Sequence, residues 1–272
     1  MSVLLISRGS MSGGQIIAEC LSHTGGFRCL TREDLIALVN QHGEIATRVM
    51  ASIEKAVTDY ERFSELRRPY KILMRLALLE YARQDNLAYF GYSGHLLVEG
   101  ISHFVRIRLL APVELRVKTT VERLHCSEAE ALDYIRRVDE ERTRWARFMY
   151  GRNIQDPRLY DLCIHMEKIS FSAVCSLLQR VLQEKEFQPT EESLAKMEEM
   201  YVAAQVEASL ATHPETQAYE IGASFHGGRL LLQGPYLDDP AEALVTELAS
   251  SVQGVQAVEY EPGYAPDLEF LP

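Results

Sequence analysis

The chain has 272 residues, of which 47% are hydrophobic and 25% are charged. This length suits one large domain or two, and the apolar content is ordinary for a globular protein with a full core. No apolar run approaches the roughly 20 residues of a transmembrane helix, and the N-terminus lacks the basic region of a secretory signal. We therefore expect no transmembrane segment and no export signal.

The cysteines and histidines show no metal-ligand spacing. Five cysteines lie scattered along the chain without a Cys-x-x-Cys pair. They are Cys20, Cys29, Cys126, Cys163 and Cys175. This pattern predicts reduced thiols in a cytoplasmic protein and no zinc. The eight histidines show no ligand spacing, and His23, His125 and His226 are expected at the surface or in turns, so no metal site is predicted from these residue types.

Charge divides the chain near residue 185. Residues 1–185 hold 26 Lys and Arg against 23 Asp and Glu, a net charge of +3, whereas residues 186–272 hold 2 against 16, a net charge of −14. Such a break predicts two domains with different partners. The acidic part should repel nucleic acid and anionic lipid, so we expect no nucleic-acid partner. The arginine-rich first part suits anionic small molecules.

The most informative stretch comes first, over residues 3–21. An apolar run over residues 3–6 predicts a buried strand, a turn rich in Gly and Ser follows over residues 9–14, and apolar residues then recur at helical spacing. We call residues 9–14 the glycine loop. A strand, a glycine-rich turn and a helix together hold phosphate in P-loop proteins, because glycine lets backbone N–H groups converge on an anion. An ordinary strand-to-helix turn shows the same pattern.

The glycine loop matches the P-loop pattern G-x-x-x-x-G-K-[ST] in part. Gly9 and Gly14 have the right spacing, but Gln15 replaces the lysine and Ile16 replaces the Ser or Thr. In P-loop proteins that lysine contacts the terminal phosphates and that hydroxyl holds magnesium. The expected phosphate-binding residues are Arg8, Gly9, Ser10, Ser12, Gly13, Gly14 and Gln15. Arg8 is the residue that could replace the missing cation.

Strands and helices alternate through the rest of the first 185 residues. Two capping boxes mark helix starts, one from Thr31 to Asp34 and one from Ser127 to Glu130. The further expected strands are residues 27–30, 87–90, 104–110 and 159–165, and the further expected helices are residues 31–41, 45–60, 69–83, 112–124, 127–150 and 170–185. This alternation predicts an α/β fold with a parallel sheet flanked by helices on both faces.

Residues 186–190, with Pro189, are the expected linker to a small α+β domain over residues 191–272. Its expected elements are a helix over residues 191–210, strands over 220–226 and 229–233 joined as a hairpin, a helix with Asp239 as N-cap, and a strand over 255–260. Residues 261–272 contain three prolines and are expected to wrap the surface.

The first 185 residues resemble the cytidylate kinase-like family of P-loop proteins. The motifs are Ser7-Arg8 with Ser12-Gly13-Gly14 and Ile17-Ala18, Arg32-Glu33 with Leu35-Ile36, Phe90-Gly91 with Gly94, Arg108-Leu-Leu-Ala-Pro112 with Arg116, Ser127 with Glu130-Ala131, Asp139 with Arg142, and Tyr160-Asp161. The resemblance implies a nucleoside monophosphate kinase fold with an arginine-bearing lid over residues 139–147. It also implies ATP as the phosphate donor, bound together with Mg²⁺.

The resemblance also implies roles for three arginines outside the glycine loop. Arg142 and Arg144 would act as catalytic residues that neutralise the transferring phosphate, since planar guanidinium groups suit phosphate oxygens. Arg116 would stack on the adenine. The alternative is an exposed helix with ion pairs such as Asp139–Arg142 and Glu140–Arg144, and a solvated Arg116.

The sequence departs from the family at four positions that are expected to bind ligand. Gln15 replaces a basic residue, Thr31 an aspartate, Tyr92 an arginine and His165 an asparagine. The loss of one preorganised charge donor costs on the order of a hundred- to a thousandfold in rate. The function therefore stays open between a kinase (a transferase acting on a nucleoside monophosphate), a catalytically degenerate kinase that senses nucleotide, and a scaffold without ligand.

Residues 191–260 resemble a BON domain. The motifs are Gly228-Arg-Leu-Leu-Leu-Gln-Gly234 and Val252-Gln-Gly-Val-Gln-Ala-Val258. The resemblance implies a small module that binds a ligand, a phospholipid or a protein, and no catalytic group stands out in it. We expect this part to bind an unidentified ligand or protein, and either to dock on the first domain or to form a homodimer.

Overall fold

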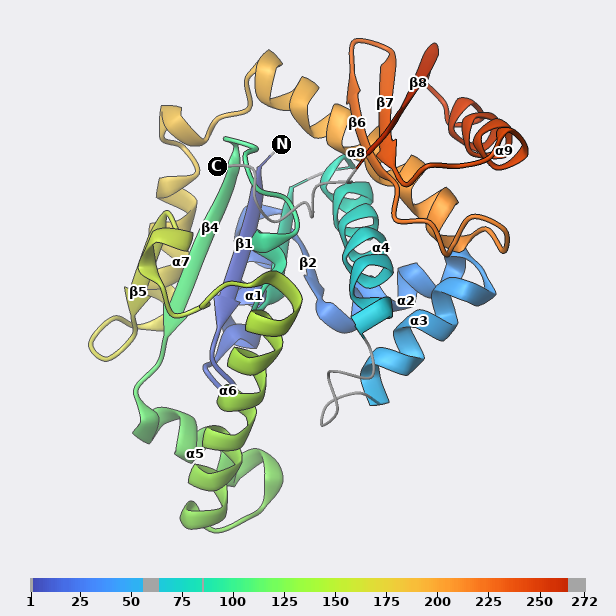
Figure 1. Ribbon diagram of the computed structural model, residues 1–272. Coiled ribbons are helices and arrows are strands. Elements are labelled where there is room, and N and C mark those ends of the chain that lie inside the picture. The colour runs from blue at the N-terminus through green and yellow to red at the C-terminus, as the bar shows by residue number, and fades with distance from the viewer. Residues whose placement is uncertain (1, 56–63, 85, 264–272) are drawn as a thin grey trace. The chain divides into compact units, whose positions relative to one another are not determined.

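The computed structural model describes residues 2–55, 64–84 and 86–263 (Figure 1). The chain forms two compact units, the first from Met1–Asp34 and Gln84–Ser193 and the second from Leu35–Arg83 and Leu194–Pro272. The C-terminal residues therefore share a unit with residues 35–83, which lie inside the segment that the sequence assigns to a first domain. The division at residues 186–190 stays a prediction.

The first unit is built on a five-stranded sheet in the order β2-β3-β1-β4-β5. Its strands are β1 (Val3–Arg8), β2 (Arg28–Thr31), β3 (Leu87–Gly91), β4 (Phe104–Leu110) and β5 (Leu162–His165). All four neighbouring pairs run parallel, which confirms the predicted parallel sheet. Because parallel strands are covered on both faces, the central strand β1 is a continuous apolar run, and residues 3–6 are at most 1% exposed.

Helices cover both sides of this sheet. They are α1 (Gly14–Gly25), α5 (Val113–Leu124), α6 (Glu128–Tyr150) and α7 (Phe171–Val181), with short 3-10 helices η3 (Gly94–Leu96), η4 (Pro157–Leu159) and η5 (Lys185–Phe187). Ile17 and Leu21 of α1 and Val174 and Leu178 of α7 join Ile6 of β1 in one core cluster. Helix α6 lies on the other side of the sheet (Figure 1). The predicted α/β class with flanking helices is therefore confirmed.

A disulfide joins α1 to α7. It links Cys20 to Cys175, whose Cα atoms lie 6.4 Å apart. The expectation that all the cysteines are reduced is therefore wrong for this pair. The two residues are separated by 155 positions, and only the packing of the two helices brings them together. Cys29, Cys126 and Cys163 are free thiols.

The second unit combines helices with a small sheet. It contains most of α2 (Arg32–Val39) and α8 (Glu191–Thr212), together with η1 (Asn40–His42), α3 (Glu44–Lys55), α4 (Ser64–Ala82), β6 (Gly222–His226), β7 (Arg229–Gly234), α9 (Asp239–Ser250) and β8 (Ala257–Pro262). Strands β6 and β7 form the predicted antiparallel hairpin, and β8 pairs parallel with β7. Leu230 and Leu232 of β7 pack with Val206 of α8 and Val245 of α9.

Two predicted helix starts are found in place and a third is shifted. Both capping boxes are confirmed, since Thr31 and Asp34 exchange hydrogen bonds at the start of α2, as do Ser127 and Glu130 at the start of α6. Helix α4 begins at Ser64, before the expected start at residue 69. The predicted positions 57 and 60 of the helix over residues 45–60 lie outside the described residues, as do residues 264–272 of the tail.

The N-cap of α9 differs from the prediction. The side chain of Asp238, rather than that of Asp239, accepts the N–H of Ala241 at 3.0 Å. An N-cap side chain accepts the N–H two or three residues beyond its own position, and Ala241 lies three residues after Asp238. Asp239 is therefore the first helical residue and Pro240 the second. Within the described parts of the chain, no helix is long and apolar enough to cross a membrane.

A buried carboxylate connects the helices of the second unit. The side chain of Glu207 on α8 is 1% exposed, and its Oε2 lies 3.5 Å from Nη1 of Arg75 on α4. Its Oε1 accepts the N–H of Ala223 on β6 at 3.1 Å. A second pair, at the surface, joins Arg83, the residue after α4, to Glu198 on α8 at 2.7 Å. Two ion pairs thus connect the end of the helical segment over residues 35–83 to α8, one with a buried carboxylate and one at the surface.

We expect Glu207→Ala to lower the free energy of unfolding by about 3–5 kcal/mol, because it removes the buried carboxylate that pairs with the half-buried Arg75. The matched control is Glu198→Ala, which removes an exposed pair and should cost about 1 kcal/mol or less. Urea unfolding followed by circular dichroism measures both values. Equal, small losses in the two variants would contradict this account of the second unit.

Candidate functional site

The glycine loop joins the central strand to the first helix through two left-handed residues. Gly13 is the N-cap of α1 with φ of +74°, and Met11 has φ of +53°, which is uncommon for a residue with a side chain. A Cβ atom on Gly13 would lie 2.4 Å from the ring of Phe171, so glycine is needed there for space as well. The hydroxyl of Ser12 donates to the carbonyl oxygen of Gly9 at 2.9 Å and closes the turn.

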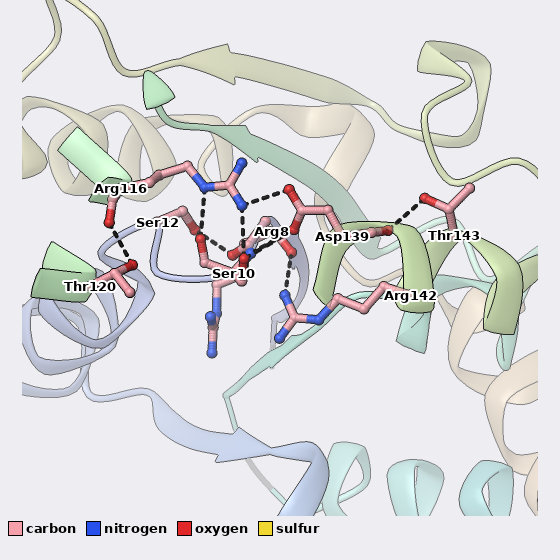
Figure 2. A network of polar contacts seen from close by, with 9 residues as sticks. Arg8, Ser10, Ser12, Arg116, Thr120, Asp139, Arg142 and Thr143 are labelled. Atoms are coloured by element: carbon pink, nitrogen blue, oxygen red, sulfur yellow. Dashed lines mark hydrogen bonds and ion pairs between the residues drawn. The ribbon is translucent and has the colours of Figure 1, made fainter. Parts of the chain in front are cut away.

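Arg116 of α5 and Asp139 of α6 hold the loop in place (Figure 2). Arg116 donates to the carbonyl oxygen of Ser10 and to its Oγ, both at 2.8 Å, and to Asp139 Oδ2 at 2.6 Å. Asp139 Oδ1 accepts the backbone N–H of Ser10 at 3.2 Å and its hydroxyl at 3.1 Å. The guanidinium of Arg116 also lies close to Gly9, where a Cβ atom would be 3.3 Å from Cζ. Arg116 is thus part of the loop structure and not a solvated helix residue.

A cavity of about 820 Å³ opens beside the glycine loop. Its wall is formed by the loop, the first turns of α1, the end of β2, one face of α5, and parts of α6 and α7. Seven of the residues expected at the site line it, namely Arg8, Ser10, Ser12, Gly13, Gly14, Gln15 and Arg142. Gly9 and Arg116 are not part of this lining, and neither is Arg144, which is exposed on α6.

Two arginines of this lining lie close together. Nη1 of Arg142 donates to the carbonyl oxygen of Arg8 at 3.4 Å, and the ring of Tyr92 lies 5.4 Å from its Cζ atom. The stem of Arg8 passes over Gly14, where a Cβ atom would lie 2.4 Å from Cδ. The Nε atom of Arg8 is buried and has no hydrogen-bond partner among the described residues. In the same part of the chain, no ion pair joins either guanidinium to a carboxylate.

The electrostatics of this pair favour an anion. Burial, and then the charge of Arg142, lower the pKa of Arg8 below its ordinary value. Burial also lowers the pKa of Arg142. Both side chains remain cationic at neutral pH, because the ordinary pKa of arginine is so high. An anion in the cavity would offset the cost of holding two cations together, and planar guanidinium groups match phosphate oxygens.

Helix α5 contributes lining residues that the sequence analysis missed. They are Leu115, Lys118, Thr119, Glu122 and Arg123. The first four are spaced as one face of a helix, at positions i, i+3, i+4 and i+7. That spacing could have indicated a common face, but only the contact of Arg116 with the glycine loop shows which way the helix is turned.

The two residues that depart from the P-loop pattern take other roles. The Nε2 of Gln15 donates to Glu19 Oε1 at 3.1 Å, one turn further along α1. Ile16 lines the cavity with a side chain that is 48% exposed, and it offers no hydroxyl to a metal ion. Among the residues that the structure describes, no cluster of three His, Cys, Asp or Glu could hold a metal. The residues present therefore do not fit the magnesium site of the P-loop pattern.

Of three other residues that the sequence singled out, Asp161 and His165 lie outside the cavity lining, whereas Thr31 is part of it. Asp161 forms an ion pair with Arg106 at 2.6 Å and accepts its backbone N–H at 2.8 Å, so it caps a strand edge. His165 lies 3.7 Å from the carboxylate of Glu167. Thr31 lines the cavity and also caps α2.

A parallel sheet whose central strand leads through a glycine-rich loop into a helix defines an α/β protein of the P-loop kinase type. The model of the cytidylate kinase-like family matches residues 3–168, which is more than half of the chain. The protein therefore belongs to the cytidylate kinase-like family.

Two further comparisons show a relative and a solved structure that the chain is similar to. The chain is 26% identical over 184 residues to a cytidylate kinase of Ignicoccus hospitalis, and the match covers 67% of this chain and 99% of that protein. An uncharacterized protein from Eubacterium ventriosum has a similar structure, with a TM-score of 0.54 at 16% identity, covering 68% of this chain and 100% of that chain. The structural likeness shows the fold alone.

We expect Asp139→Ala to loosen the glycine loop, because it removes the acceptor of the Ser10 N–H and the partner of Arg116. The expected loss of unfolding free energy is about 1–3 kcal/mol, with faster amide hydrogen exchange over residues 9–14. Asp133→Ala, at an exposed position on the same helix, is the control and should leave both unchanged. Wild-type exchange of the loop in Asp139→Ala would contradict the role given to Asp139.

Proposed function

We propose that the protein binds a nucleotide with its phosphates between the glycine loop and the pair formed by Arg8 and Arg142. The observation that carries this proposal is that Arg8 and Arg142 both line one cavity. Neither of the two cationic groups has a carboxylate partner in the described residues. Phosphate oxygens accept charge-assisted hydrogen bonds from such groups. The nearby N-terminus of α1 also favours an anion. A volume of about 820 Å³ suits a small-molecule ligand.

Family membership supports phosphoryl transfer from ATP to a nucleoside monophosphate as the activity. In this proposal Arg8 takes the place of the missing lysine, and Arg142 neutralises the group in transfer. Arg144 would join them only if α6 moves, because it does not line the cavity. Arg116 would act by positioning the loop, and its stacking on adenine stays a prediction.

Gln15 and Ile16 favour a second candidate function without turnover. A catalytically degenerate kinase would bind nucleotide and pass the signal to a partner through the BON-like part over residues 191–272. The acidic charge of that part favours a protein or small-molecule partner over nucleic acid. We place such a sensor in the cytoplasm, with a homodimer as one form of the partner. Small-angle scattering profiles that do not change with saturating nucleotide would count against the sensor.

Substitution of either cavity arginine should weaken binding of ATP. Arg8→Gln and Arg142→Gln each remove a charge-assisted hydrogen bond, and we expect the dissociation constant to rise about ten- to a hundredfold. Arg136→Gln, at an exposed position on α6 outside the cavity lining, is the control and should bind like wild type. Isothermal titration calorimetry measures all three. If wild-type affinity survives in both cavity variants, the phosphates bind elsewhere.

Restoring the P-loop residues should separate the two candidate functions. We expect Gln15→Lys combined with Ile16→Ser to transfer phosphate at least about a hundredfold faster than wild type, because each missing donor costs on the order of that factor. The assay follows ATP consumption with Mg²⁺ and a panel of nucleoside monophosphates that includes CMP. Equal, measurable rates in the two proteins would show that Gln15 and Ile16 do not limit turnover, and would contradict the sensor.

A further inference from the structure

The cavity lacks the group that would place a magnesium ion on bound phosphates. At the position of the P-loop hydroxyl, Ile16 presents an alkyl side chain that is 48% exposed. The neighbouring Gln15 turns its amide to Glu19. Magnesium prefers oxygen ligands in a near-octahedral arrangement, and it is usually held by one or two carboxylates together with the phosphates. An alkyl side chain cannot take part in such a shell.

The carboxylates around the cavity do not replace that hydroxyl. Those in the lining are Glu19, Glu33 and Glu122, which come from three different helices. Glu19 accepts the hydrogen bond of Gln15, and the charge of Glu33 acts on Arg8. All three are exposed, and no cluster of three possible ligands occurs among the described residues. The lining carboxylates therefore form no ligand cluster for a metal ion.

Positive charge is supplied instead by protein side chains. Arg8 and Arg142 come from β1 and α6, and Figure 2 shows both guanidinium groups on the same side of the loop network. The buried Nε of Arg8 has a hydrogen atom to donate and no acceptor in the described part of the chain. Arg142 is half-buried, with Tyr92 beside it. Guanidinium groups donate hydrogen bonds to the same phosphate oxygens that magnesium would coordinate.

We infer that the polyphosphate of the nucleotide binds here as the free anion, without magnesium, its charge neutralised by Arg8 and Arg142. This inference rests on the proposed nucleotide binding and names the metal-free form of the ligand. Magnesium in solution then competes with the two arginines for the phosphate oxygens, and it lowers the negative charge that attracts the ligand to the cavity. Binding should be tighter when the metal is removed.

The test is calorimetric titration of the full chain with ATP, once in EDTA and once in excess MgCl₂ at matched ionic strength. We expect binding about three- to tenfold tighter in EDTA, because the free anion carries more charge toward the two cations. Equal affinity in the two buffers would show that the magnesium complex binds as well as the free anion, and would also overturn the inference. Tighter binding with magnesium would overturn the inference and leave the proposed nucleotide binding intact. Absence of binding in both buffers would overturn the proposed function and this inference together.

A matched pair of variants tests the role of Ile16. Ile16→Ser restores the hydroxyl, and we expect it to shift the ratio of the two affinities toward magnesium by about threefold or more. Ile16→Val changes the side chain without adding a ligand, and it should keep the wild-type ratio. Because the position is exposed, both variants should fold, and circular dichroism checks this. The same ratio in the two variants would overturn Ile16 as the reason for metal-free binding.

Discussion

The candidate site depends on the carboxylate of Asp139. This one group accepts hydrogen bonds from Ser10 and pairs with Arg116, so it joins the glycine loop to both α5 and α6. Arg142 follows three residues later on α6, on the same side of the helix. The contact that fixes the loop therefore also sets Arg142 over the cavity. A change at Asp139 should act on the shape of the loop and on the position of the cation together.

The same contact decides the charge of the cavity. Asp139 pairs with Arg116, and neither Arg8 nor Arg142 forms an ion pair with a carboxylate among the described residues. Holding two cations together at low exposure costs free energy, and burial lowers the pKa of both. An entering phosphate would repay that cost. The loss of the P-loop lysine and hydroxyl is thus accompanied by a different source of positive charge.

Local spacing predicted the parallel sheet of the first unit and the hairpin of the second, whereas contacts between distant segments could not be predicted. The apolar run before the glycine loop, both capping boxes and the hairpin depend on neighbours in the chain, and the structure confirms them. The pairs Cys20–Cys175, Arg116–Asp139 and Arg75–Glu207 join residues from separate helices. Their partners are chosen by how helices are turned and packed, and no motif records that.

The central claim is that the phosphates of a nucleotide bind between the glycine loop and the two arginines. The most direct measurement is a crystal structure of the complex with a non-hydrolysable ATP analogue in EDTA. Our account predicts phosphate oxygens within hydrogen-bond distance of loop N–H groups and of the guanidinium groups of Arg8 and Arg142, with the pair Arg116–Asp139 still in place. Phosphates bound outside this cavity, or both guanidinium groups turned away from them, would contradict it.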